Sequence, residues 1–204
     1  MKKSVITKIL VGACSMALVA AVSIGATVAY LTSQDNADNV FTIGNVTIDL
    51  QEPGWDANLG ASSALDIEPG MSTEKDPQVK NVGKNDAYIR VKVSIPQLKG
   101  EDLFQYSVNG TDFGKEYYNT TDWVMEETAE PGVYYFYYNK ILAPTQTTGK
   151  IFNHVKLDAA LAIEDTIEET NIEVYAEAVQ TKGIDVGGKT GAEAAKAAFV
   201  AAGL

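Results

Sequence analysis

The side chains of this sequence that could do chemistry are few. One histidine, His154, and one cysteine, Cys14, are present among 204 residues. A zinc protease usually needs two histidines one helical turn apart with a glutamate between them, and this chain cannot supply that pair. A serine hydrolase of the common type needs a Gly-x-Ser-x-Gly elbow, which the sequence lacks. We therefore predict no catalytic residue, no metal ligand and no cofactor, and hence a protein that is not an enzyme.

Two further motifs look like binding sites. The stretch from Gly183 to Thr190 satisfies the phosphate-loop pattern, but too few residues follow it to form a strand that could bring an acid to magnesium. We interpret it as a flexible link to a terminal helix. Four carboxylates form an acidic cluster without EF-hand spacing, namely Glu164, Asp165, Glu168 and Glu169. We interpret this cluster as a solvated loop, and whether it binds calcium stays open.

The N-terminus has the pattern of an export signal. Three lysines, Lys2, Lys3 and Lys8, precede an uncharged apolar run over residues 9–31. Signal peptidases accept small residues at the last and third-last positions before the cut, which are Ala29 and Thr27 here. We predict a signal peptide with an N-terminal signal helix over residues 1–29, cleaved between Ala29 and Tyr30, and hence a secreted protein.

Two other interpretations of the same apolar run stay open. It is long enough to cross a membrane, so an uncleaved anchor is an alternative. The segment from Val11 to Cys14 also has the look of a lipoprotein box, in which the cysteine would carry a lipid.

Composition narrows the classes of partner. The formal net charge is −11, and loss of the signal lysines would make the exported chain more acidic still. Such a surface repels phosphate backbones, so we predict no nucleic-acid partner. Because Cys14 lies in the predicted signal, the exported chain would hold no disulfide, and its stability must come from a hydrophobic core.

Several segments after the predicted signal have the pattern of β-strands. Apolar residues alternate with polar ones over residues 45–50, 87–95 and 172–179, the period of a half-buried strand. Residues 123–125 and 133–138 flank Glu130-Pro131-Gly132, which predicts a hairpin. A further strand region is expected around Val155 and Leu157, extending to Leu161 and Ile163. Residues 190–204 predict a helix, with Thr190 and Glu193 as a capping box.

Many short strands with Pro-Gly turns and no alternation with long helices favour an all-β fold, an antiparallel β-sandwich with a short C-terminal helix. We expect an extended N-terminal segment over residues 30–39, the sandwich over residues 40–182, and a Gly-rich link with the helix over residues 183–204.

Two segments near the predicted cleavage site are the most specific part of the sequence, namely Ala26-Thr27-Val28-Ala29-Tyr30-Leu31 and the block from Ala37 to Val46, followed by Ile48-Asp49-Leu50. They resemble the TasA/camelysin family of exported Gram-positive proteins. The resemblance continues at residues 67–70, 79–91 and 174–180, while the centre of the chain diverges.

The resemblance implies a jelly-roll protein of the cell surface, processed by a signal peptidase of the SipW type. TasA builds biofilm matrix fibres, in which the N-terminal segment of one subunit completes a sheet of the next. Transferred to this chain, the candidate donor-strand anchors are Tyr30, Leu31, Val40 and Phe41. The implied partners are further copies of the chain and other matrix or cell-wall components. The physical basis is β-augmentation, in which an extended strand satisfies an open sheet edge.

Three alternatives stay open. The N-terminal segment could be an unstructured leader that only spaces the domain from the signal. Camelysin is described as a surface metalloprotease, so the second branch of the resemblance implies a metallopeptidase. Finally, the aromatic run from Tyr134 to Tyr138 should point about half of its rings outward, which would suit a monomeric adhesin that stacks on sugars.

Overall fold

The computed structural model describes residues 41–43, 46–57, 67–162 and 171–204. The predicted signal helix, the cleavage site at Ala29 and Tyr30, the anchors Leu31 and Val40, and the acidic cluster at residues 164–169 lie outside the described residues. Within the described ranges, no helix is long and apolar enough to cross a membrane.

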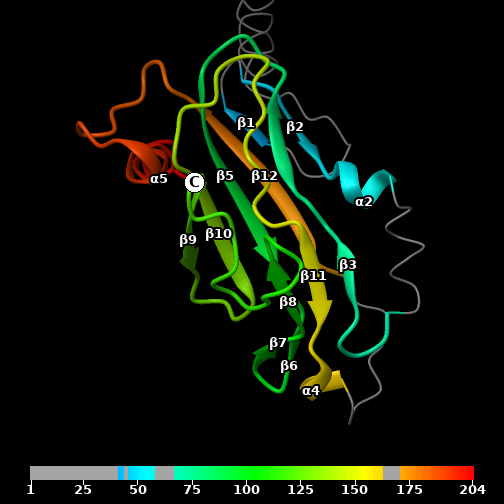
Figure 1. Cartoon of the computed structure of the whole chain (residues 1–204). Helices are drawn as coiled ribbons and strands as arrows, with labels where there is room; N and C mark the ends of the chain where they lie inside the picture. The colour runs from blue at the N-terminus through cyan, green and yellow to red at the C-terminus, as the bar shows by residue number, and fades with distance from the viewer. Residues whose placement is uncertain (1–40, 44–45, 58–66, 163–170) are drawn as a thin grey trace, which may run out of the picture. The chain divides into compact units, whose positions relative to one another are not determined.

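One layer of the fold is a five-stranded sheet with the order β1-β12-β5-β10-β9 (Figure 1). Its strands are β1 (Phe41–Ile43), β12 (Glu173–Gln180), β5 (Ala87–Ser94), β10 (Val133–Tyr138) and β9 (Trp123–Glu127). All neighbours pair antiparallel except β1, which runs parallel to β12. The parallel edge strand departs from the wholly antiparallel prediction.

The other layer is built from two smaller sheets. One has the order β3-β11-β8 and the other pairs β2 with β4. Their strands are β2 (Ile48–Gln51), β3 (Ser72–Glu74), β4 (Gln78–Asn81), β8 (Phe104–Ser107) and β11 (His154–Leu157). The backbone N–H of Thr148 donates to the carbonyl of Val79, and that of Ile151 donates to the carbonyl of Pro77, each at 2.9 Å. These hydrogen bonds attach the segment before β11 to β4 and to the residue before β4. The two small sheets therefore continue one another.

Shorter elements complete the described chain. A two-stranded hairpin joins β6 (Gln97–Leu98) to β7 (Glu101–Asp102), and the helices are α2 (Pro53–Ala57), α4 (Ala159–Ala162) and α5 (Gly191–Ala201). The strand predicted to continue through Leu161 is wrong, because α4 begins two residues after β11. An alanine-rich stretch favours the helix there.

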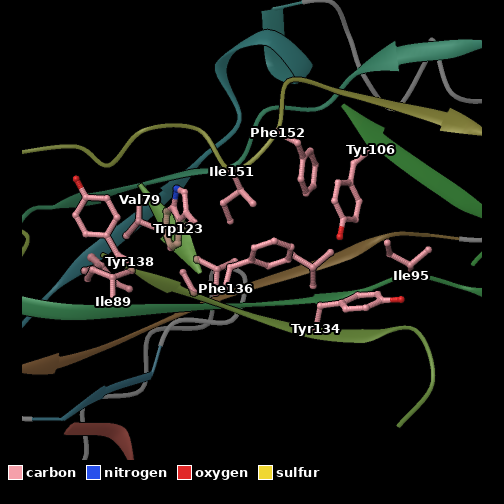
Figure 2. Close-up of a cluster of buried hydrophobic side chains, with 14 of the residues drawn as sticks. Val79, Ile89, Ile95, Tyr106, Trp123, Tyr134, Phe136, Tyr138, Ile151 and Phe152 are labelled. Carbon is pink, nitrogen blue, oxygen red and sulfur yellow. The ribbon is translucent and has the colours of Figure 1, made fainter. Parts of the chain in front are cut away.

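Successive side chains of β5 point to opposite faces of the sheet, and each face belongs to a separate hydrophobic core. Ile89, Val91 and Val93 are fully buried between the layers, where they pack with large rings from β9 and β10 such as Trp123 and Phe136 (Figure 2). Even-numbered residues of β5 point to the opposite face, which α5 covers through a second cluster around Phe199. The predicted all-β sandwich with a C-terminal helix is confirmed, and its sheets are antiparallel except for the β1–β12 pair.

The backbone N–H groups at the N-terminus of α5 have a different hydrogen-bond partner from the one predicted. Thr190 stands at the N-cap position, but its side chain makes no capping hydrogen bond. Instead the backbone N–H of Ala192 donates to the side-chain oxygen of Asn139, at 3.1 Å. The capping-box prediction is therefore wrong, because a residue distant in sequence occupies the cap.

Candidate functional site

The edge of the five-stranded sheet at β1 is only partly covered. Its register pairs Phe41 with Glu177, Thr42 with Ala178 and Ile43 with Val179. Because β12 has eight residues, β1 accompanies less than half of its length. Among the described residues, no strand pairs with residues 173–176 on this side. An unpaired strand edge is where another strand can add.

The opposite edge of the same sheet is closed by the molecule's own chain. The outward N–H of Trp123 donates to the carbonyl of Asn119 at 3.0 Å, and that of Met125 donates to the hydroxyl of Tyr118 at 3.4 Å. These contacts satisfy the outward N–H groups of Trp123 and Met125 on the free side of β9. A strand from another molecule would have to displace them.

The second layer is closed on the same side. The N–H of Gly114 donates to the carbonyl of Tyr106 in β8 at 3.1 Å. The segment of residues 108–122 therefore shields both β8 and β9, and we call that side the closed flank. The side formed by β1 and by the edge of β12 that no described strand pairs with is called the open flank. The side-chain oxygen of Asn119 accepts from the N–H of Asp122, three residues on. Asparagine is typical of turns, so the sequence carries a local signal for this one.

The sequence-predicted residues fall in different places. Phe41, the one donor-strand anchor inside the described residues, begins β1 on the open flank. His154 lies in β11, where its register partners are Ser107 and Glu74 and its ring packs against the turn at Gly110. Within the part of the chain that the structure describes, no group of three or more metal-ligating side chains occurs.

The aromatic hairpin is covered on both faces, which corrects the expectation that half of its rings point into solvent. Tyr134, Phe136 and Tyr138 are buried between the layers. Tyr137 is 7% exposed and packs edge-on against Phe199 of α5, and Tyr135 is half-buried over Arg90. The helix α5 therefore covers the face of the hairpin on which a glycan would have to stack.

Burial raises the pKa of several tyrosines. For Tyr106, Tyr134, Tyr137, Tyr138 and Tyr175, loss of water around the hydroxyl is the largest cause of a pKa above the ordinary value near 10. The pKa of Tyr134 rises further because its hydroxyl donates to Asp102 at 2.5 Å.

These pKa shifts predict alkaline unfolding. The unfolded chain releases tyrosine protons near pH 10 whereas the folded chain retains them, so the stability is complete below pH 10 and falls as the pH rises above it. We expect the absorbance of tyrosinate at 295 nm to rise together with loss of the near-ultraviolet circular dichroism. Tyr134→Phe should make the stability fall less steeply as the pH rises. Tyr117→Phe, which changes an exposed ring, should leave this pH dependence unchanged. Complete titration near pH 10 in a folded protein would contradict this prediction.

Comparisons of the chain with protein-family models, with curated proteins and with solved structures found no match. The resemblance to the TasA/camelysin family therefore rests on the sequence segments quoted above.

Proposed function

We propose that this chain is a secreted structural protein of the cell surface or biofilm matrix that forms fibres by donor-strand pairing. Its sandwich would have jelly-roll topology, and a SipW-type signal peptidase would release the segment beginning at Tyr30. The observation that carries the proposal is the open flank, where a three-residue parallel strand is all that accompanies β12 among the described residues. Short edge strands of this kind are readily replaced by a strand of another copy.

The proposed step is an exchange of equivalent strands. In the isolated molecule, β1 pairs with its own β12. In a fibre, β1 and the residues before it would instead lie beside β12 of the neighbouring copy, in the same parallel register. The backbone bonds lost in one molecule are regained in the next, so the exchange costs little and the extra length of paired strand favours assembly.

Truncation tests this function. Protein beginning at Tyr30 is expected to form filaments visible by electron microscopy, whereas protein beginning at Asn45 should form none because it lacks β1. A synthetic peptide of residues 30–43 should bind the Asn45 form with one-to-one stoichiometry in calorimetry, because that form presents an empty β12 edge. Equal filament formation by the two proteins would remove the donor-strand proposal.

A further inference from the structure

A groove opens at the end of the sandwich where the β6–β7 hairpin and the β9–β10 turn lie. Its volume is about 440 Å³, and its floor includes the rings of Phe104, Tyr106 and Tyr134. This end carries the β6–β7 and α4 labels in Figure 1, away from β1. The groove therefore lies apart from β1.

Carboxylates dominate the groove. Five line it, namely Glu101, Asp102, Glu127, Glu130 and Asp158. The one cation in the lining, Lys115, lies 2.6 Å from Glu127 and is already paired. Burial is the largest cause of the raised pKa of Tyr134, and nearby carboxylates raise this pKa further. Their effect agrees with a negative electrostatic potential in the groove. A groove with an apolar floor and an acidic rim suits lysine side chains, whose stems are apolar and whose heads are charged.

The opposite end of the sandwich presents such side chains. Lys84 lies in the turn between β4 and β5, and Lys182 follows the end of β12. The two segments are joined by the N–H of Thr181, which donates to the carbonyl of Asp86 at 3.0 Å. Both lysines are exposed, and the described residues form no ion pair with either.

The two ends are far apart along the strand direction. β5 begins at Ala87, beside the lysine-bearing turn, and ends at Ser94, three residues before the β6–β7 hairpin. The whole length of that strand therefore separates the lysines from the groove, and they cannot fill it within one molecule. A contact between them requires a second copy.

We propose that the lysine-bearing end of one copy docks into the acidic groove of the next, so that subunits stack head to tail. A contact between two different surfaces of the same chain propagates without closing, so stacking would align subunits head to tail, while strand exchange would link them into a stable fibre. The chain's net charge of −11 makes copies repel in most orientations, so this approach is selected by charge complementarity. The inference rests on the proposed fibre function and names a second contact between subunits, independent of strand exchange.

Charge reversal tests the contact. The full chain is expressed in a secreting Gram-positive host, and the exported protein is recovered from the medium. Glu101→Lys with Glu130→Lys should weaken self-association by about tenfold or more in sedimentation, and Lys84→Glu with Lys182→Glu should do the same. The variant that carries all four changes regains attraction between the ends, so its self-association should return. All four side chains are exposed, and circular dichroism should confirm the unchanged fold.

Two results would overturn the inference. One is normal self-association of the Lys84→Glu, Lys182→Glu protein, which would mean that the groove takes another cation or none. The other is failure of the folded fourfold variant to regain association.

A cross-linked protein distinguishes failure of strand exchange from failure of the stacking contact. The association should persist, and weaken with added salt, in protein whose β1 is covalently fixed to its own β12. Salt-sensitive association together with undiminished filaments in that protein would keep the stacking contact and reject only the donor-strand mechanism.

Discussion

A disulfide that joins β1 to β12 within one molecule is expected to abolish fibre formation. Thr42 and Ala178 are register partners in neighbouring strands, so Thr42→Cys with Ala178→Cys introduces a thiol at each of two paired positions. Adjacent strands lie about 4.8 Å apart, within the range of Cα separations that disulfides span. The change is made in a Cys14→Ser background, which leaves no competing thiol. The oxidised protein should stay without filaments in electron microscopy.

The physical reason is that strand exchange requires β1 to leave its own sheet. A covalent bond between β1 and β12 keeps the edge of β12 occupied and withholds the donor strand from the neighbour at the same time. Reduction should restore filaments in the same sample, which separates the cross-link from any effect of the substitutions.

A second cross-link serves as the matched control. Ser94 and Glu173 are register partners between β5 and β12, away from β1. Ser94→Cys with Glu173→Cys should leave fibre formation intact when oxidised, because β1 is still free to exchange. Filaments that form equally well from the oxidised Thr42→Cys, Ala178→Cys protein would exclude exchange of β1.

Local patterns predicted those parts of the fold that depend on neighbours in sequence. The alternation of Ile89, Val91 and Val93 marked β5, and Pro131-Gly132 marked the β9–β10 hairpin, because each pattern has a local physical cause. The alanine-rich stretch around Ala195 likewise marked α5.

The remaining features depend on distant contacts that no local pattern encodes. The parallel pairing of β1 joins Phe41 to Glu177, more than a hundred residues away. The cap of α5 comes from Asn139 for the same reason. The closed flank follows from a loop without regular structure, and its role becomes visible only when Tyr118 is seen against Met125.

Arg90 illustrates how such a contact changes an interpretation. Its place on the polar face of β5 suggests a solvent-exposed charge, yet it is 5% exposed in the structure. α5 covers it, and its guanidinium lies 4.3 Å from the ring centres of both Tyr135 and Phe199. A covered arginine needs a partner, and Glu177 on the neighbouring strand accepts from it at 2.6 Å.

Loss of Glu177 is therefore expected to destabilise the domain strongly. Glu177→Ala leaves the Arg90 guanidinium buried without its counter-charge, which costs about 3–5 kcal/mol of unfolding free energy for pairs of this kind. Because Arg90 and Glu177 join β5 to β12 directly opposite one another, the loss also weakens the strand that accepts β1. Urea denaturation followed by circular dichroism measures the change.

Two variants distinguish the loss of charge compensation from a general effect of substitution. Arg90→Met combined with Glu177→Leu removes both charges, so it should recover most of the lost stability. Lys196→Ala breaks the exposed pair between α5 and Glu126 and should cost less than about 1 kcal/mol. If Glu177→Ala cost no more than Lys196→Ala, the buried pair would not hold the outer face of the sheet to α5, and the apolar packing of Phe199 alone would account for that contact.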